Sequence, residues 1–360
     1  MNLDYIRALD RYPAYVYDLR GLADHTRDIR SALGATELFY AAKANPDAEI
    51  LRAIAPHVDG VEVSSGGELT HVRDVLPQAR IAFGGPGKTD EELALALALD
   101  VDRIHVESPH ELARLAALGP ADVLLRANLP ITTPNAVLSM SGPFGMDEDA
   151  LTDCARHLAG TPHLRLRGVH AHLASGLDAS TMADLARKIT DWALPWLRAL
   201  DVADPEVNIG GGMAVDYAEP DARFDWHAYG AALPQGTLRV EPGRAITAYH
   251  GWYVTDVLDV KTTRGETFVV LRGGTHHLRT PAAKGHDQPF TVLTRPHGTT
   301  MTATLVGQLC TPKDVLARNV PVPPLAPGDV LAFTMAGAYA WNISHQNFLM
   351  HPPPTFHYLS

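Results

Sequence analysis

The chain has 360 residues, 46% of them hydrophobic and 20% charged, and its formal net charge is −11. This composition is typical of a soluble globular protein, and the negative charge disfavours nucleic acid as a partner. No apolar run approaches the roughly 18 residues of a membrane span, and the N-terminus lacks the apolar core of a signal peptide. Only two cysteines occur, Cys154 and Cys310, so a disulfide framework is not expected. We therefore expect a cytoplasmic protein with no membrane partner.

The segment 1–30 contains one β-like run, YPAYVYDL, at residues 12–19. Its aromatic and β-branched residues favour a strand. We expect this segment to add a strand to a sheet that forms in the C-terminal third of the chain. An isolated edge strand is the alternative.

Residues 31–245 alternate short β-type runs with helical segments such as TDEELALALALD (89–100) and SPHELARLAALG (108–119). Strand followed by helix, repeated eight times over roughly 210 residues, predicts an α/β fold of the (β/α)8 barrel type. A doubly wound open sheet predicts fewer strands and usually a glycine fingerprint after the first strand, which this chain lacks. The eight runs are ELFYAAKA (37–44), GVEVSS (60–65), RIAFGG (80–85), RIHVES (103–108), DVLLRANLP (122–130), LRGVHAHLAS (166–175), EVNIGGG (206–212) and TLRVEPGR (237–244).

Residues 246–360 form a second region, in which β-type runs are broken by glycine, proline and threonine without helical spacers of comparable length. We expect a C-terminal β-domain of the β-sandwich or β-barrel type. Its runs are AYHGWYVTDVLDVKTT (248–263), TFVVLRGG (267–274), FTVLTR (290–295), TATLVGQLC (302–310) and DVLAFTMAGAYA (329–340).

In barrels the chemistry lies at the C-terminal ends of the strands. The first strand end, FYAAKANPD (39–47), places Lys43 after an apolar run and before an Asn-Pro turn signal, which suggests that Lys43 is buried. A buried lysine tends to lose its charge, and its amine can then form an imine with an aldehyde. A lysine whose ammonium group merely reaches water is the alternative.

The sixth and seventh strand ends are rich in histidine and glycine. His170, His172 and Ser175 lie at the sixth strand end. Three interpretations of the two histidines are open: metal ligands, an aromatic plate under a flat cofactor, or packed core residues. No third metal ligand is evident nearby in the sequence. Gly210–Gly212 follow the seventh, and successive glycines allow backbone N–H groups to approach a phosphate closely.

The eighth strand end, EPGR, carries Glu241 and Arg244. The two side chains either pair with each other or address the two ends of one ligand, with the arginine on a phosphate and the acid on a protonated ring nitrogen. A lysine, a stacking histidine, a glycine nest, an acid and an arginine together match the needs of pyridoxal 5′-phosphate.

With these motifs, the chain resembles the fold-type III pyridoxal-phosphate decarboxylases, the group of ornithine, arginine and diaminopimelate decarboxylases. The likeness covers almost the whole chain in the family's motif order. It implies that Lys43 is the Schiff-base lysine, that His172 stacks on the cofactor ring and that Glu241 binds the pyridine nitrogen. It also implies that the cofactor phosphate is held by Ser175, Gly210, Gly211, Gly212, Gly243 and Arg244.

The C-terminal region extends this resemblance. GQLCTPKD (307–314) looks like the family's loop with a catalytic cysteine, here Cys310, and GAYAWN (337–342) like its tyrosine segment, which makes Tyr339 a phosphate contact. The family pairs two subunits so that the cysteine reaches the partner's active site. Cys310 would then protonate the α-carbon after the carboxylate has left, although a buried structural thiol is the alternative.

One departure from the family bears on the substrate. Members that act on basic amino acids usually have an acid directly after the loop cysteine, whereas this chain has Thr311, with Asp314 three residues further on. The segments GGTHHLRTPAA (273–283) and WNISHQNFLMHPPP (341–354) look like those of siderophore-pathway decarboxylases, which act on a citryl-diaminopropionate intermediate of staphyloferrin B-type assembly. Candidate partners for its carboxylates are His277, Arg279 and His345, with His276, Ser344 and Asn347 as further candidates.

Rival readings stay open on sequence alone. Diaminopimelate or another basic amino acid is the leading alternative substrate. A racemase shares the fold, but such racemases place an arginine at the ring nitrogen, where this chain has Glu241. A relative without catalysis is disfavoured because Lys43, Glu241 and Cys310 are all present. No metal site is expected.

Overall fold

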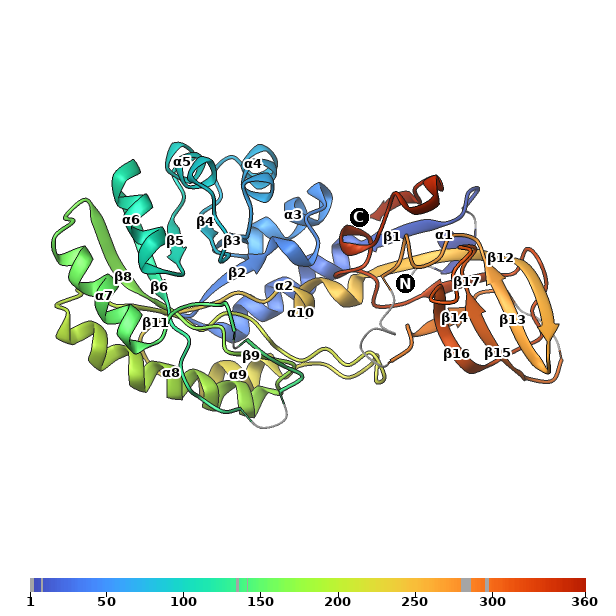
Figure 1. Cartoon of the computed structure of the whole chain (residues 1–360). Coiled ribbons are helices and arrows are strands. Elements are labelled where there is room, and N and C mark those ends of the chain that lie inside the picture. Colours follow the sequence, from blue (N-terminus) through green and yellow to red (C-terminus); the bar gives the residue numbers. More distant parts are fainter. Residues whose placement is uncertain (1–2, 8, 134–135, 141, 280–285, 295–297) are drawn as a thin grey trace. The chain divides into compact units, whose positions relative to one another are not determined.

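The computed structural model describes residues 3–7, 9–133, 136–140, 142–279, 286–294 and 298–360 (Figure 1). The chain forms two compact units. One comprises residues 23–214 and 223–246, and the other comprises residues 1–22, 215–222 and 247–360. Residues 215–222, which lie within the range that the sequence suggests for the barrel, thus cluster with the second unit.

The first unit is built on a closed barrel of eight parallel strands, which confirms the predicted (β/α)8 fold and excludes the open sheet. Each of the eight predicted β-type runs overlaps one barrel strand. The strands are, in the order in which they pair around the barrel, β2 (Glu37–Ala41), β3 (Gly60–Val63), β4 (Ile81–Phe83), β5 (Arg103–Val106), β6 (Ala121–Arg126), β8 (Leu164–His170), β10 (Glu206–Asn208) and β11 (Thr237–Val240).

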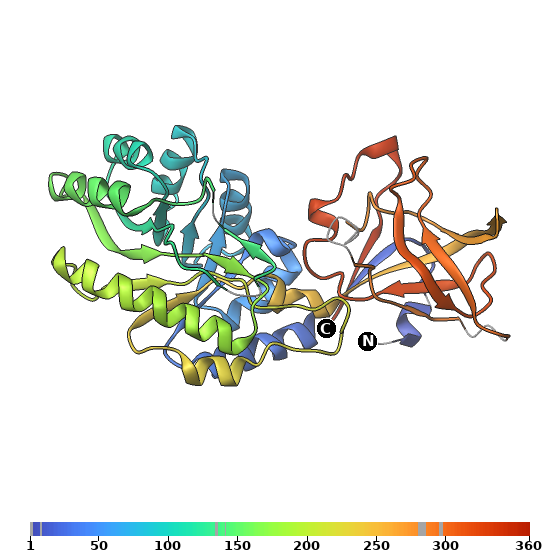
Figure 2. The same ribbon diagram turned by 60° about the horizontal axis from the view of Figure 1, so that its bottom comes forward.

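Helices lie outside the ring of strands in this unit (Figure 2). A two-residue pair of strands, β7 (Leu138–Ser139) with β9 (Ala174–Ser175), joins the loops after β6 and β8. The helices of the unit are α2 (Leu19–Leu33, from residue 23 on), α3 (Ala48–Ile54), α4 (Gly66–Val75), α5 (Asp90–Ala98), α6 (Pro109–Leu118), α7 (Glu148–Ala159), α8 (Ala179–Ala199), α9 (Trp226–Ala232) and the first residues of α10 (Arg244–Thr247).

Local capping signals explain where the two helices singled out in the sequence begin. The side chain of Thr89 accepts from the backbone N–H of Glu92, and the Glu92 side chain accepts in return from the N–H of Thr89, which forms a capping box at α5. At α6, Ser108 caps the helix and Pro109 takes the first helical position, where a missing N–H costs nothing. These caps leave the preceding loops free to face the barrel mouth.

The second unit contains a curled, mostly antiparallel sheet, as predicted for the C-terminal region. Two strands escaped the sequence analysis, β16 and β18, because Pro321 and a run of prolines at 352–354 read as strand breakers there. The path of the sheet is β14 (Phe290–Val292), β17 (Val330–Phe333), β12 (Gly251–Thr263), β13 (Glu266–Leu271), β15 (Met301–Val306) and β16 (Val315–Val322), in which β13 and β15 are parallel.

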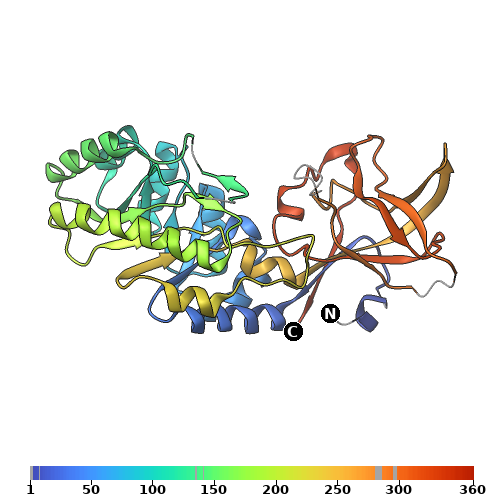
Figure 3. The same cartoon turned by 90° about the horizontal axis from the view of Figure 1, so that it is seen from below.

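The N-terminal strand belongs to this sheet. β1 (Ala14–Asp18) pairs antiparallel with β12 and parallel with β18 (Thr355–Leu359), and Figure 3 shows the blue strand among orange and red ones. Val16 packs in one buried cluster with Ile6 of α1 (Leu3–Arg7), Trp252, Val254 and Ala332. Apolar side chains from both ends of the chain therefore share one core. No described helix has the length and apolar character needed to cross a membrane.

Candidate active site

Lys43 lies at the C-terminal end of the first barrel strand, on a 3-10 turn, η1 (Ala42–Ala44), that directly follows β2. Ala42 and Ala44 are buried, but 45% of the Lys43 side chain is exposed, so the expected burial of this lysine is wrong. The turn directs the side chain away from its buried neighbours. Its Nζ lies 2.5 Å from Oε2 of Glu62 and 3.5 Å from Oγ of Ser64.

Glu62 is a functional candidate that the sequence analysis missed. It lies in β3, is 4% exposed, and accepts a 2.8 Å hydrogen bond from Ser64. Burial raises the pKa of Glu62, but the charge and hydrogen bond of Lys43 outweigh it, and the pKa is lowered. An acid within the otherwise apolar run GVEV was the available signal, because such a residue needs a partner inside the barrel.

His172 follows β8 and is partly buried at the barrel mouth. Burial, helped by the positive charges of Lys43 and Arg126, lowers its pKa to about 4, so the imidazole is neutral at pH 7. Its Nε2 lies 3.4 Å from Oγ of Ser175, the other predicted residue of this loop. A neutral, flat ring suits stacking against an aromatic cofactor better than ion pairing.

The three glycines after β10 lie where no side chain fits. Gly210 and Gly212 have φ angles of 70° and 106°. A Cβ at Gly210 would lie 2.5 Å from Cβ of His172, and one at Gly211 would lie 2.5 Å from the carbonyl oxygen of Glu241. The glycines therefore bring the His172 and Glu241 loops together, which adds a packing reason to the phosphate nest expected from the sequence.

Glu241 follows β11 and is buried against three side chains from other strands. Asn208 donates a 2.6 Å hydrogen bond to its Oε1, while Nε2 of His105 and of His170 lie 3.7 and 3.5 Å from its oxygens. Burial, together with the charge of Glu62, raises the pKa of Glu241 to about 7. Among the described residues, the groups that contact this buried carboxyl are an amide and two histidine rings rather than a cation.

His170 contacts Glu241 rather than pairing with His172 around a metal. Burial lowers the pKa of His105 and His170 well below the usual value, so both rings are neutral at pH 7. Among the described residues, neither Nδ1 of His105 nor Nδ1 of His170 has a hydrogen-bond partner. Although His105, His170 and Glu241 offer ligand atoms within 4.8 Å of one another, Glu241 is the acid that the resemblance assigns to the cofactor ring.

Two further buried ion pairs frame the mouth, and the sequence analysis missed both. Arg126 at the end of β6 donates to Glu107 at 2.6 Å. Lys88, after β4, donates to Glu111 at 2.8 Å and also to the carbonyl oxygens of Gly85 and His105. Because Nζ of Lys88 is buried and has three acceptors, Lys43 is the better placed of the two amines to react with an aldehyde.

The loop after the last barrel strand, β11, contacts the end of the first, β2. The N–H of Ala41 donates to the carbonyl of Pro242 at 3.2 Å, and a Cβ at Gly243 would lie 2.7 Å from Cβ of Ala44. Arg244 opens α10 directly after this contact. Lys43, His172, the glycine run and Glu241 therefore lie at one end of the barrel, and this set fits pyridoxal phosphate: an amine, a neutral ring, a close backbone approach and a buried acid.

In the second unit, the residues of the cysteine loop, 307–314, differ in their exposure. Cys310 is exposed and Thr311 partly buried, whereas Asp314 is 2% exposed. The two carboxylate oxygens of Asp314 accept backbone hydrogen bonds from Thr275 and Leu309, at 2.7 and 2.8 Å. Both oxygens of the buried Asp314 carboxylate thus hold backbone N–H groups, and its expected partial compensation for Thr311 stays a prediction that this burial disfavours.

The residues that are expected to bind the substrate's carboxylates also differ in their exposure. His277 is 1% exposed, its Nδ1 lies 3.2 Å from the hydroxyl of Tyr253, and burial lowers its pKa to about 3. It is neutral and packed within this unit, and its expected contact with the substrate's carboxylates stays a prediction. Arg279 and His345 are exposed. Tyr339 is partly buried with a φ of 49°, and residues 280–283 of the same predicted substrate segment lie outside the described residues.

Ser344, named as a further candidate, donates to the carbonyl oxygens of His276 and Trp341 at 2.9 and 2.8 Å. His276 is fully buried, and its ring lies 3.9 Å from that of His277. Asn347 is exposed. The hydroxyl of Ser344 thus fixes the chain between two predicted substrate segments.

Comparisons with known proteins agree with this geometry. Residues 19–248 match the model of the pyridoxal-binding domain of pyridoxal-dependent decarboxylases. The chain is 40% identical to 2-[(L-alanin-3-ylcarbamoyl)methyl]-2-hydroxybutanedioate decarboxylase of Staphylococcus aureus, over 96% of this chain and 94% of that protein. It is 33% identical to diaminopimelate decarboxylase of Actinosynnema pretiosum, over 95% and 83%.

Among solved structures, diaminopimelate decarboxylase from Helicobacter pylori, complexed with L-lysine, matches with a TM-score of 0.91 and 25% identity, covering all of this chain and 94% of that one. The fold, the residues at the strand ends and these matches lead to one conclusion: the chain belongs to the pyridoxal-dependent decarboxylases, and its cofactor is pyridoxal phosphate.

Proposed function

We propose that this chain removes the α-carboxylate of citryl-diaminopropionate, in the assembly of a carboxylate siderophore of the staphyloferrin B type. The name of the Staphylococcus aureus relative describes this conjugate: a citryl group joined by an amide to the 3-position of an alanine. The 40% identity over nearly both full lengths supports the transfer of this substrate.

The charges of the predicted substrate segments carry the proposal. Residues 273–279, 307–314 and 339–351 contain a single carboxylate, that of Asp314, and both its oxygens are bonded to backbone N–H groups. Arg279 and His345 are exposed in the same segments. A substrate with a distal ammonium would find no available acid there, whereas carboxylates would find a guanidinium.

The barrel residues would hold the cofactor as follows. Lys43 would bind it covalently, with Glu62 and Ser64 fixing the amine beforehand. Glu241 would accept from the protonated ring nitrogen, and neutral His172 would lie against the ring. The phosphate would be held by Ser175, Gly210, Gly211, Gly212, Gly243, Arg244 and Tyr339.

When bound, pyridoxal phosphate supplies an electron sink for the bond that breaks as CO2 leaves. The protein has to place that bond and then return a proton to the α-carbon. Cys310 would deliver this proton from its thiol, which is exposed and within reach of solvent. Glu241 would help this sink, because a buried carboxylate favours a proton on the group it faces.

The substrate is tested by decarboxylation assays on citryl-diaminopropionate, diaminopimelate, ornithine and arginine. We expect the citryl conjugate to have the highest kcat/KM. Arg279→Ala should lower kcat/KM for it about tenfold or more, because charge-assisted contacts are worth roughly 1.5–3 kcal/mol. Arg318→Ala, which removes an exposed arginine of the same unit, should leave it unchanged.

Thr311→Glu restores an acid beside Cys310 and should shift preference toward diamino acids. The proposal is wrong if the wild-type protein prefers diaminopimelate or ornithine and does not turn over the citryl conjugate.

We further propose that the enzyme is a homodimer in which Cys310 serves the partner's site, as the resemblance implies. Inactive Lys43→Ala and Cys310→Ala proteins should then regain activity when mixed, because a mixed dimer contains one intact site. Failure despite demonstrated subunit exchange would place both residues in one chain's site or deny the role of Cys310.

A further inference from the structure

Asp314 joins two loops that the proposed function places at the substrate. One loop contains Gly274, Thr275 and Arg279, and the other contains Leu309 and Cys310. Oδ1 accepts from the N–H of Thr275, at 2.7 Å, and Oδ2 from the N–H of Leu309, at 2.8 Å. The residues that this carboxylate holds are thus the direct neighbour of Cys310 and a residue four positions before Arg279.

The space around the carboxylate is shaped for it. A Cβ at Gly274 would lie 2.5 and 2.6 Å from the two oxygens of Asp314, and a Cβ at Gly307 would overlap Oδ2. Two glycines on different loops therefore leave room for one side chain. The carbonyl of Gly274 also accepts from the N–H of His277, at 2.9 Å. This hydrogen bond lies in the same loop as Arg279.

Hydrogen bonds between Gln308 and Gly273 form a second link between the two loops. The N–H of Gln308 donates to the carbonyl of Gly273 at 2.8 Å, and the Gln308 side chain accepts in return from the N–H of Gly273, at 2.7 Å. The carbonyl of Asp314 accepts from Gly307, at 3.0 Å. The two loops therefore form one hydrogen-bonded assembly with the Asp314 carboxylate at its centre.

We infer that Asp314 is a positioning residue, which sets Cys310 and Arg279 relative to each other through its two backbone hydrogen bonds and does not contact the substrate. This inference rests on the proposed function for the roles of those two residues. Only a carboxylate fills this role, because both oxygens must accept. The amide nitrogen of asparagine cannot, so Asp314→Asn leaves one buried N–H without its acceptor.

The holoenzyme variants Asp314→Asn and Gly307→Ala test this inference. Asparagine keeps the shape and removes one acceptor, while alanine keeps the carboxylate and displaces it. We expect both to lower kcat by about tenfold or more, because a misplaced catalytic group costs rate out of proportion to its displacement. The factor in kcat should be the same for every substrate that the wild type accepts, because Cys310 would protonate all of them, and any rise in KM should be confined to the citryl conjugate, which Arg279 would bind. Asp329→Asn, which alters a partly exposed turn carboxylate of the same unit, should have no effect on kcat.

A contact with a substrate ammonium would give a different pattern, in which Asp314→Asn raises KM for diaminopimelate and spares the citryl conjugate. That pattern, or full kcat in Asp314→Asn, would overturn the inference. If the wild type decarboxylates neither substrate, the proposed function fails, and the positioning role falls with it.

Hydrogen exchange on the holoenzyme gives a reading that does not depend on activity. The amides of Thr275 and Leu309 should exchange slowly, because both are bonded to a buried acceptor. Asp314→Asn should speed exchange in residues 273–279 and 307–314 and leave the barrel peptides unchanged. Fast exchange of both amides in the wild type would contradict the inference.

Discussion

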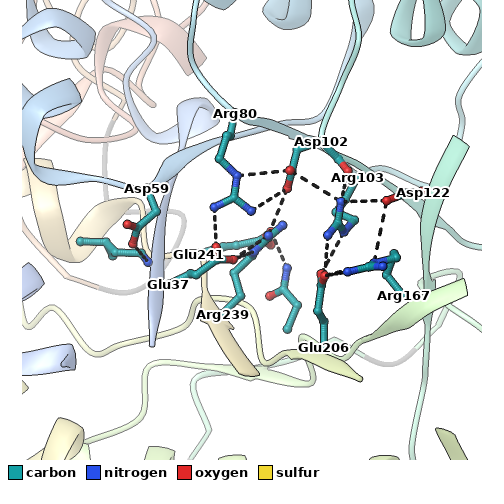
Figure 4. A network of polar contacts seen from close by, with 12 residues as sticks. Glu37, Asp59, Arg80, Asp102, Arg103, Asp122, Arg167, Glu206, Arg239 and Glu241 are labelled. Atoms are coloured by element: carbon teal, nitrogen blue, oxygen red, sulfur yellow. Dashed lines mark hydrogen bonds and ion pairs between the residues drawn. The ribbon is translucent and has the colours of Figure 1, made fainter. Parts of the chain in front are cut away.

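Both ends of the barrel carry charged side chains and ion pairs, but only the C-terminal end also holds a buried acid, Glu241, whose described contacts are neutral. At the N-terminal ends of the strands, arginines alternate with acids in the network drawn in Figure 4. Arg103 donates to Glu206 at 2.9 Å, and Arg239 donates to Glu37 at 2.6 and 2.9 Å. Figure 4 also draws Arg80, Asp102, Asp122 and Arg167, and Arg165 pairs with Asp122 as well.

The pKa shifts of buried groups also differ between the two ends of the barrel. Burial raises the pKa of Glu37, but the hydrogen bond from Arg80 and the charge of Arg239 outweigh it, so the pKa is lowered and the carboxylate stays charged. At the C-terminal end, burial wins, and the pKa of Glu241 rises to about 7 while that of His172 falls to about 4. Glu62 is the exception because Lys43 pairs with it.

The difference teaches how one barrel separates stability from chemistry. The N-terminal end pairs its arginines with acids of other strands. The C-terminal end has ion pairs as well, but beside them it holds neutral histidines and Glu241, whose described contacts are an amide and two neutral rings. Burial of such an acid is costly unless a ligand supplies the missing partner.

The largest effect is expected at Lys43. Because imine formation needs the amine at the first strand end, Lys43→Ala should lower kcat/KM by at least about a thousandfold. Borohydride reduction of the wild-type holoenzyme, followed by peptide mapping, should place the pyridoxyl group on Lys43. Lys261→Ala, at an exposed position of β12, should retain full activity. A label on Lys88 or Lys261 would refute the assignment.

Breaking the N-terminal network should cost stability and spare the chemistry. Arg103→Ala removes one partner from a pair whose side chains are 10% and 11% exposed, and such losses cost about 3–5 kcal/mol of unfolding free energy. Arg165→Ala, with a side chain 69% exposed, should cost less than about 1 kcal/mol. Denaturant unfolding measures both. A large rise in KM in folded Arg103→Ala would show that the two ends are not independent.

Glu241 predicts a pH dependence of the cofactor-free protein. Its pKa is about 7 in the folded chain and lower in the unfolded chain, so folding retains a proton between these values. The stability that this provides is complete below the unfolded pKa and is lost as the pH rises through about 7. Glu241→Gln cannot ionise, so its Tm should fall less than that of the wild type between pH 5 and pH 8. Parallel Tm curves for the two proteins would count against a buried protonated acid.

The smallest effect has the opposite sign. His172 has a pKa lowered to about 4, so its contribution to stability is present above the unfolded value and is lost as the pH falls through about 4. His172→Phe keeps a flat ring without a titrating group. In the cofactor-free protein it should reduce the loss of Tm between pH 6.5 and pH 4. An unchanged acid profile would mean that His172 is solvated in the folded state.

Local sequence was sufficient for the barrel and for the residues at its mouth. Alternation of β-type runs with capped helices is a property of neighbouring residues, and strand ends follow from it, so Lys43, His172, the glycine run and Glu241 could be named in advance. Their roles toward the cofactor stay predictions. The strands β16 and β18 were missed because prolines at sheet edges look like breaks when no partner strand is known.

Only the tertiary structure decided which groups meet. Glu62 pairs with Lys43, 19 residues away in the sequence, and Arg103 binds Glu206, 103 residues away. Asn208, which is 33 residues from Glu241, contacts it together with two histidines. The same holds for Asp314, whose spacing after Cys310 suggests a substrate contact but whose carboxylate is enclosed by a loop almost 40 residues away. Sequence determines which side chains are available at each strand end. Closure of the barrel and packing of the loops decide their burial, partners and protonation, because these depend on distances that no local pattern contains.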